Sequence, residues 1–428
     1  MVNLDETPKM LVHCAFKTEL NPTKEQAPLF NKHADVRRFA YNYGVSRKHE
    51  TADQNDAIEV INAVNESQGN PLIKPLRYPT AVDLAKELVN SKNTDRPWLG
   101  EVSKHVRQEA LRDLDSAVHN HFKNPEHFGF PQFKSKQDTR PSFTFTGNSP
   151  TAQKVIELEA WRIKLPFIGW VRLKEHVKLL ERFRKVIIHS ATVSKVAGRW
   201  FVSLGIEVER EAPVPQTGEP FGADRGYGDE LLVISNADRT KFEVIKNPRL
   251  YRKAEKKLAH LQRIASRKQQ GSKRRVKAQL KVARLNYHIA EVRKDFIHKT
   301  TTRLAKTYPA LVVETLSVKP MAKENGKSVA DAAMSEFVRQ LEYKTWYGME
   351  LIHADRWYPS TQRCSRCHGR YKIDRDELVY RCPSCSLVAG RNVNAAANLA
   401  QWPTVRGTLK TTATESEELG GQSGKGAW

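Results

Sequence analysis

Two Cys-x-x-Cys pairs constrain the fold of this chain more than any other feature of its sequence. Cys364 and Cys367 form the first pair, Cys382 and Cys385 the second, and 14 residues separate the pairs. Four thiolates at about 2.3 Å from one tetrahedral ion make a structural zinc site with no open position for catalysis. The segment between the pairs is long enough for a β-hairpin, so the sequence predicts a zinc ribbon. Disulfides or a redox-active dithiol are the alternatives, and both fit a reducing compartment less well.

The charge balance points to a polyanionic partner. The chain has 428 residues, with 71 Lys and Arg against 48 Asp and Glu, and a formal net charge of +23. Such a surplus indicates nucleic acid, and a generically basic surface is the alternative. No run approaches the roughly 20 apolar residues of a membrane-spanning helix, and the first residues lack the pattern of a secretory signal. A membrane or secreted protein is therefore not expected, and the length suggests roughly two to four domains.

Much of the positive charge lies in one segment, 249–306, which has the pattern of two long helices broken at Gly271-Ser272. Residues 251–300 hold 16 Lys and Arg and only 3 Asp and Glu. A solvated helix face is the ordinary explanation of a charge run, but this density favours a surface that follows a phosphate backbone. The candidate phosphate-binding residues are Lys253, Lys256, Lys257, Arg263, Arg267, Lys268, Lys273, Arg274, Arg275 and Lys277.

The N-terminal half of the chain alternates between β-rich and helical patterns. A strand is expected near 10–20, and a polar, loop-rich stretch over 51–78. Short β-rich runs with Gly and Pro between them fill 127–211 and indicate a small barrel or sandwich. Because the strand near the N-terminus suits that barrel, the intervening helices are interpreted as an insertion. The spacing of apolar residues predicts helices over 24–50, 80–95 and 101–123.

Two carboxylates stand in or at the end of apolar runs that are predicted to be strands. Asp224 lies in a predicted hairpin over 221–238, and Glu314 ends the apolar run within 309–316. A buried charge is costly there unless it serves a metal or a partner. Two acids from separate strands suit a magnesium-dependent phosphodiesterase, in which two ions about 3.5–4 Å apart hold the attacking and leaving oxygens. Taken singly, either acid also fits a structural salt bridge.

The order of these segments resembles the TnpB family, proteins carried by bacterial insertion sequences and related to the type V CRISPR effectors. The resemblance covers about residues 10–402, and its C-terminal motifs are more specific than its N-terminal ones. The matching segments are VRRFAYNY (36–43), FGFPQF (128–133), KLPFIGWVRL (164–173), FGADRG (221–226), VVETL (312–316), EFVRQLEYKTWYG (336–348), the four cysteines and RNVNAAANLA (391–400).

The resemblance implies a multidomain α+β fold. Its parts are a wedge-like β-barrel, an inserted helical recognition domain, a RuvC-like domain of the RNase H fold that includes the basic helical pair, and a zinc-ribbon insertion. The expected boundaries are 1–29 and 124–216 for the barrel, 30–123 for the recognition domain, 217–358 and 388–404 for the RuvC-like domain, 359–387 for the zinc ribbon and 405–428 for a disordered tail.

The resemblance also implies a nuclease site with one altered position. Asp224 matches the family's first acid and Glu314 its second. The third is an Asp directly before x-N-A-A, and here Asn392 stands in its place, with no Asp or Glu between Cys385 and Glu415. An amide oxygen can contact Mg²⁺ but supplies no negative charge, on which a two-ion site depends, so we expect cleavage to be lost or strongly reduced. There are two alternatives. An acid elsewhere in the chain replaces the missing third acid, or Asn392 was introduced deliberately.

Further nucleic-acid contacts are expected on the first predicted helix. Arg37, Arg38 and Tyr41 are candidates to clamp or stack on bases, and core packing is the alternative for the tyrosine. The phenylalanines of FGFPQF (128–133) are expected in the core of the barrel.

The implied function is RNA-guided recognition of double-stranded DNA. A guide RNA would be the bound partner, and base pairing would read most of the target. We expect guided binding with cleavage lost or strongly reduced, so whether the chain is an enzyme stays open. The alternatives are an active magnesium-dependent RNA-guided endonuclease of a transposable element and, from another class, a DNA transposase or a zinc-ribbon DNA-binding protein. Structural zinc is expected, with Mg²⁺ if any cleavage remains, in a bacterial cytoplasmic protein associated with the nucleoid.

Overall fold

A computed structural model describes residues 9–147, 155–180, 183, 185–374 and 377–419. The chain divides into two compact units, 1–211 and 212–428, and each is considered by itself. The four-part division expected from the sequence is finer than this and stays a prediction. Over the described ranges, no helix has both the length and the apolar character needed to cross a membrane.

The first unit is built on a seven-stranded antiparallel sheet with the order β2-β6-β7-β1-β5-β4-β3. Phe143 and Phe145 near one edge of the sheet share a single hydrophobic core with Ile163 and Leu165 near the other edge. A sheet whose opposite edges meet in one core must fold over on itself, so it is barrel-like. Its strands are β1 (Lys9–Asn21), β2 (Ser142–Thr146), β3 (Glu157–Glu159), β4 (Arg162–Leu165), β5 (Gly169–Leu173), β6 (Val186–Val196) and β7 (Arg199–Glu211), with the short helix η2 (Val177–Leu179) between β5 and β6.

Over the described residues, the α-helices of the first unit and η1 lie between β1 and β2 in the chain, as expected for an insertion. They are α1 (Gln26–Gln68), α2 (Ala81–Asn93), η1 (Pro97–Glu101) and α3 (Lys104–Lys123). The shared core of these helices includes Val45, Leu84, Leu111 and Leu114. The prediction of a loop-rich stretch over 51–78 is wrong for its first part, because α1 continues to Gln68 and ends only where Gly69 adopts a left-handed backbone conformation. The segment is polar because most of its side chains are exposed, not because it lacks regular structure.

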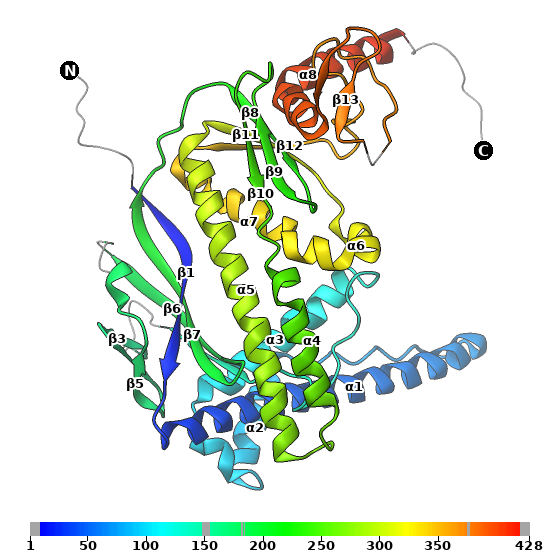
Figure 1. The fold of residues 1–428 in the computed structure, drawn as a ribbon. Helices are drawn as coiled ribbons and strands as arrows, with labels where there is room; N and C mark the ends of the chain where they lie inside the picture. The colour runs from blue at the N-terminus through cyan, green and yellow to red at the C-terminus, as the bar shows by residue number, and fades with distance from the viewer. Residues whose placement is uncertain (1–8, 148–154, 181–182, 184, 375–376, 420–428) are drawn as a thin grey trace, which may run out of the picture. The chain divides into compact units, whose positions relative to one another are not determined.

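The second unit contains a five-stranded sheet with the order β10-β9-β8-β11-β12 (Figure 1). Strands β8 (Pro220–Arg225), β9 (Glu230–Ser235) and β10 (Phe242–Lys246) form an antiparallel meander. Strands β11 (Ala310–Glu314) and β12 (Glu350–Ala354) then add parallel to β8. This order and these directions are those of the RNase H fold, so that part of the expected fold class is confirmed. Strands β10 and β12 were not foreseen from the sequence.

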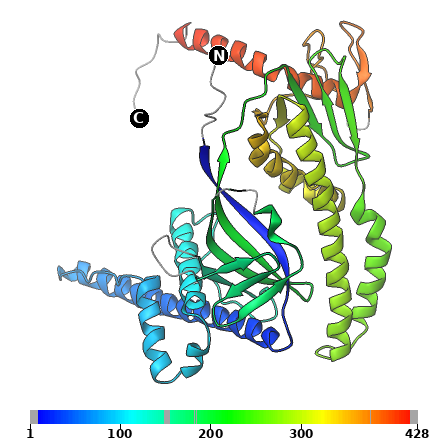
Figure 2. The ribbon, with the colours of Figure 1, turned by 90° about the vertical axis from the view of Figure 1, so that its left-hand side faces the viewer.

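Helices cover the two faces of this sheet differently. On one face, α5 (Lys273–Thr307) and α7 (Met334–Lys344) pack against the alternate strand residues Phe221, Ala223 and Val313. The basic segment forms α4 (Leu250–Ser266) and α5, which lie side by side in Figures 1 and 2, with the predicted break between them. Helix α6 (Val318–Ala332) and η3 (Thr345–Tyr347) complete the connection from β11 to β12.

Helix α8 (Arg391–Leu419) packs on the other face, against β8, β9 and β11. Gly222 makes this contact possible, because a Cβ atom built there would lie 1.8 Å from the carbonyl oxygen of Ala396. The paired strands β13 (Val379–Arg381) and β14 (Val388–Gly390) precede the helix and form the hairpin of the predicted ribbon. The helix runs beyond the end predicted for it, so the expected disordered tail starts as helix up to Leu419, and 420–428 lie outside the described residues.

Candidate nuclease and metal centres

The two acids that the sequence singled out meet at neighbouring strand ends. Parallel pairing aligns Val313 of β11 with Ala223 of β8, so Glu314 and Asp224 follow at the same level. Side chains alternate along a strand, so Asp224 shares its face with Gly222, which contacts α8. Both carboxylates therefore lie on the sheet face that α8 covers, where they can act on one substrate atom.

Burial and mutual repulsion set the electrostatics of this acid pair. Asp224 is 8% exposed. Burial first, and then the charge and hydrogen bond of Glu314, raise the pKa of Asp224 well above its usual value. Among the described residues, no ion pair within 4.0 Å neutralises either carboxylate; Arg391 and Arg225 only partly offset the shift. A shared proton or a cation stabilises a buried carboxylate that faces a half-buried one, and an all-oxygen donor set is the kind that Mg²⁺ prefers.

Arg225 fixes the position of Glu314 through the backbone. Its guanidinium donates hydrogen bonds to the carbonyl oxygens of Glu314 and Met334, which tie the end of β11 to the start of α7. Burial lowers the pKa of this arginine. The contact is to a carbonyl and not to the acid, so the carboxylate of Glu314 remains available as a ligand.

Asn392 lies in the first turn of α8 and faces an acid that the sequence analysis did not identify. Its side-chain nitrogen Nδ2 donates a hydrogen bond to Oε2 of Glu230, over 2.7 Å. Glu230 is the first residue of β9, which pairs with the strand carrying Asp224. The only signal in the sequence was the position of Glu230 at the start of the apolar run LLVIS within the predicted hairpin.

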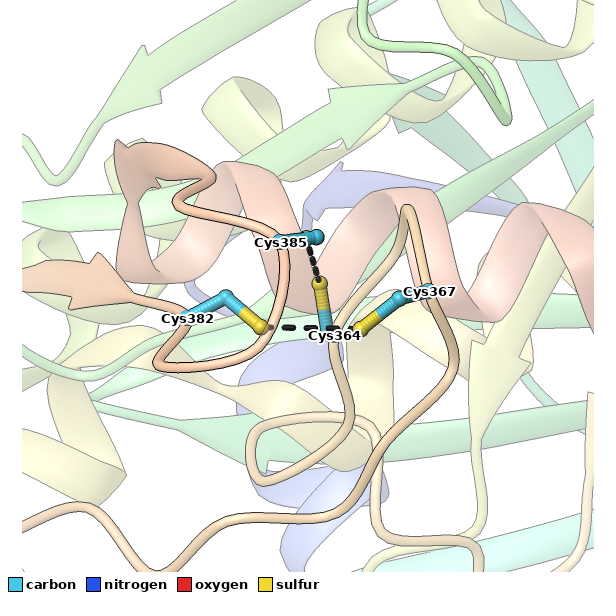
Figure 3. Close-up of side chains that lie close together, drawn as sticks. All are labelled: Cys364, Cys367, Cys382 and Cys385. Carbon is cyan, nitrogen blue, oxygen red and sulfur yellow. Dashed lines mark hydrogen bonds between the residues drawn. The ribbon is translucent and has the colours of Figure 1, made fainter.

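The four cysteines converge as the sequence predicted (Figure 3). The sulfur atoms of Cys364 and Cys385 lie 3.6 Å apart, and those of Cys367 and Cys382 lie 3.5 Å apart. A tetrahedron of sulfurs at about 2.3 Å from its centre has edges of about 3.8 Å, so these spacings fit one ion of that size. Burial opposes ionisation of Cys382, but the backbone N–H groups of Cys385 and Ser384, together with the thiols of Cys367 and Cys385, outweigh it and lower its pKa to about 6.

The ten basic candidates lie on α4, on α5 and in the turn between them, and together they are called the basic surface of α4 and α5. Nine of the ten candidates are exposed, and only Arg275 is partly covered. Among the described residues, no carboxylate lies within ion-pair distance of any of the ten, whereas nearby Lys299 and Arg303 are paired with Asp295 and Glu243. Unpaired, exposed cations on two adjoining helices can contact phosphates without first breaking internal ion pairs.

The candidates on α1 differ from one another. Arg37 bonds Ser142 and Asp113, and Arg38 pairs with Asp35, so both are already engaged within the first unit. Tyr41 is 7% exposed and belongs to the helical core, with the ammonium of Lys134 3.2 Å from its ring centroid. In this structure the ring of Tyr41 is not available to stack on a base. The tyrosine packs in the core, which was the alternative interpretation.

The aromatic residues of FGFPQF do not lie in the barrel core, contrary to expectation. Phe128 and Phe133 are exposed, and the rings of Phe130 and Phe133 contact His49 of α1. The segment follows α3 directly, so it packs beside the helices that precede it and not inside the sheet.

One more group in the first unit has a donor set suited to a metal. The ligand atoms of His13, His189 and Glu207 lie within 4.8 Å of one another on adjacent strands. His13 and His189 are exposed and contact Glu207 over 3.6 and 3.3 Å, so polar contacts of the two rings with one carboxylate account for the arrangement.

Comparison with protein families gives three matches in order along the chain. The family OrfB_IS605, described as "Probable transposase", matches residues 203–325. Its helix-turn-helix domain matches 10–56, and the domain described as "Cas12f1-like, TNB domain" matches 335–399. The last of these spans the four cysteines and the start of α8, so the comparison and the geometry single out the same region.

Individual relatives cover nearly the whole chain. A Streptomyces pristinaespiralis protein named "Putative RNA-guided DNA endonuclease" is 33% identical over 398 residues, which are 90% of this chain and 88% of that protein. InsQ of Escherichia coli, named in the same way, is 30% identical over 90% of this chain and 91% of its own length. The TnpB-like protein L79 of Acanthamoeba polyphaga mimivirus is 26% identical over 42% of this chain and 36% of its own. With such identity over nearly its full length, and with the RNase H sheet and the four-cysteine cluster in place, the chain belongs to the TnpB family.

Proposed function

We propose that this chain is an RNA-guided DNA-binding protein that recognises double-stranded DNA through a bound guide RNA. The observation that carries the proposal is the 33% identity over 398 residues to a relative named as an RNA-guided DNA endonuclease. The unpaired basic surface of α4 and α5 supports it, because backbone contacts supply affinity while base pairing selects the target. We expect the protein to act in the bacterial cytoplasm, at the nucleoid.

The second unit contains two sets of side-chain donor atoms, and each set suits a different metal. The four sulfurs suit zinc, which would hold the ribbon's two cysteine pairs together and add to the stability of the second unit. The acid pair Asp224 and Glu314 suits Mg²⁺, because both are oxygen ligands and their shared negative charge lacks a full internal counter-charge. When bound there, Mg²⁺ would polarise a DNA phosphate and stabilise the charge that develops during hydrolysis.

Whether the bound DNA is cut depends on the third acid. The presence of Asn392 favours a protein that binds its target and blocks access to it without cutting, as a repressor would. The contact between Asn392 and Glu230 favours the second candidate, an active endonuclease, because it brings another carboxylate to the altered position. A transposase would need the same three acids to join DNA ends, and a zinc-ribbon DNA-binding protein would need neither the acids nor RNA.

The experiment is to purify the chain from bacteria that carry its gene with the flanking DNA, and to sequence the RNA that copurifies. We expect one RNA species with a constant 5′ part and a variable 3′ segment. A target complementary to that segment, with random sequence beside it, is then offered in a gel-shift assay with Ca²⁺. Retention of targets that share one neighbouring motif is expected. A chain without bound RNA, or one that retains matched and scrambled targets equally, would overturn the proposal.

A further inference from the structure

We infer that Glu230 supplies the third carboxylate of the nuclease centre, and that Asn392 positions it. This inference rests on the proposed function and goes beyond it, because it assigns a catalytic role to a residue outside the family's usual acid positions. It predicts that the native chain cuts its target DNA.

The first support is the direct contact of the two side chains. Nδ2 of Asn392 lies 2.7 Å from Oε2 of Glu230, although the residues are 162 positions apart in the chain. Asn392 occupies the position at which the family's third acid is expected, so the carboxylate of Glu230 lies about one hydrogen bond away from it. Glu230 also starts the strand that pairs with β8, the strand of Asp224.

The second support is the complementarity of an amide and a carboxylate. An Asp at 392 would set two carboxylates against each other at this distance, and like charges so close repel strongly. The amide of Asn392 instead donates to Glu230 and fixes one of its oxygens. Asn392 is then a positioning residue and not merely a missing ligand.

The third support is the electrostatic setting of Glu230. Among the described residues, no Lys, Arg or His forms an ion pair with this carboxylate, although its neighbour Asp229 pairs with Arg249. The N-terminus of α8, which carries partial positive charge, begins at Arg391 beside it and favours an anion there. Glu230 therefore has no internal salt bridge among the described residues, and its carboxylate is available to a divalent cation.

The three acids lie on three neighbouring strands, and this bears on how many ions they could hold. Asp224, Glu314 and Glu230 do not gather within 4.8 Å of one another among the described residues, so they do not form a compact site for a single ion. Two-ion nuclease sites separate their ions by about 3.5–4 Å, so each acid needs to reach only one of them. Glu230 on β9 and Glu314 on β11 lie on strands to either side of β8, which carries Asp224.

The reaction assigned to this centre is hydrolysis of a DNA phosphodiester. The oxygen of a water molecule forms a bond to phosphorus while the bond from phosphorus to one ester oxygen breaks. The water loses a proton to solvent, and the leaving oxygen gains one. The three carboxylates would hold divalent cations, which would polarise the phosphate, so each carboxylate should matter to the rate and little to target binding.

The test compares cleavage of the matched target by RNA-loaded native protein and four variants. We expect native protein and the control Asp229→Asn to cut, and Glu230→Gln to lose cleavage by about 100-fold or more while binding the target unchanged. Asn392→Asp alone should not cut faster than the native chain. The double variant Glu230→Gln/Asn392→Asp moves the negative charge back to 392 and should recover about tenfold or more of the lost rate. Thermal unfolding of each variant separates misfolding from loss of chemistry.

A second readout does not depend on cleavage. Binding of Mn²⁺ to the RNA-loaded protein, followed by electron paramagnetic resonance, should weaken by about tenfold or more in Glu230→Gln and be unchanged in Asp229→Asn. Equal Mn²⁺ affinity in native protein and Glu230→Gln would overturn the inference. So would a native chain that binds its matched target without cutting it while Asn392→Asp cuts it, and in that case the proposed guided binding would still stand. Loss of guided binding itself would overturn the proposed function, with the Mn²⁺ measurement still deciding the role of Glu230.

Discussion

The side-chain oxygen Oδ1 of Asn394 accepts a hydrogen bond from the backbone N–H of Ser365, over 3.0 Å. Its nitrogen Nδ2 donates to the carbonyl of Arg363 over 2.8 Å, so one buried side chain holds both backbone groups that flank Cys364. Asn398, one helical turn further on, donates to the carbonyls of Ser360 and Arg363. The first cysteine pair and helix α8 are therefore one structural piece, and the helix that carries Asn392 is anchored by the proposed zinc ribbon.

Replacing Asn394 by alanine should loosen both the metal site and the helix. The change leaves the buried N–H of Ser365 without its partner, at a cost of about 1–3 kcal/mol, and removes one of the two side-chain hydrogen bonds to the Arg363 carbonyl. We expect faster release of zinc to a chromogenic chelator and a lower denaturation midpoint. Lys372→Ala, an exposed change in the same ribbon, should leave both unchanged. An Asn394→Ala protein that releases zinc at the native rate would contradict the anchoring role.

Substituting Gly222 should separate α8 from the sheet. A Cβ there would meet the Ala396 carbonyl oxygen at 1.8 Å and the Ala400 nitrogen at 2.5 Å, and both are backbone atoms that cannot rotate away. Gly222→Ala should cost about 1–3 kcal/mol of unfolding free energy, or more, as overpacking does. Gly228→Ala, at a position with no atom within 4 Å of the added Cβ, is the control. Urea unfolding measures both, and equal midpoints would argue against a tight contact between β8 and α8.

The basic surface of α4 and α5 should carry a measurable share of the salt dependence of nucleic-acid binding. Changing Lys273, Arg274 and Lys277 to Gln removes three unpaired cations. Each phosphate contact that is lost reduces the magnitude of the negative slope of log K against log salt by about 0.7–0.9. We therefore expect a slope that is shallower by about 2–3 in RNA or DNA binding, measured by fluorescence anisotropy.

The matched control removes the same net charge from cations that are already paired. Lys241, Lys299 and Lys327 form ion pairs with Glu219, Asp295 and Glu255. Their replacement by Gln should change the slope much less. Equal effects of the two triple variants would mean that net charge alone, and not this surface, drives binding.

Lys344 should make the stability of the second unit rise with pH above neutrality. It is 5% exposed, its ammonium donates to the carbonyl of His298 and the hydroxyl of Thr301, and burial lowers its pKa to about 8. Below pH 8 it is charged in both states and the burial cost is fully present. Between pH 8 and the unfolded value near 10.5, the unfolded chain binds more protons, so unfolding becomes harder as pH rises.

Lys344→Met removes this titration. The native protein should gain on the order of 1–3 kcal/mol relative to the variant between about pH 7.5 and pH 10. Denaturant unfolding of both proteins across that range measures the difference. A constant difference between them would show that Lys344 titrates alike in the folded and unfolded states.

Local sequence patterns were sufficient for the features whose chemistry is confined to a short segment. The spacing of Cys364, Cys367, Cys382 and Cys385 predicted the cluster, and the charge density of 251–300 predicted an exposed basic helical pair. Asp224 and Glu314 were predicted as site residues because each stands in or at the end of an apolar run, and the structure places them on adjoining strands. The extent of α1 was not predicted, because its exposed second half lacks the apolar periodicity that distinguishes a helix from a polar loop.

Only the tertiary structure decided which residues meet. Tyr41 lies in the core and not at a surface, because α3 and Lys134 cover it, and neither adjoins it in the sequence. Glu230 faces Asn392 because the β8–β9 register and the packing of α8 on Gly222 bring together residues 162 positions apart. A sequence motif compares residue types only at fixed local spacing. The motif comparison therefore identified Asn392 only as the loss of an acid. The acid beside it is a consequence of strand pairing and helix packing, which no local spacing encodes.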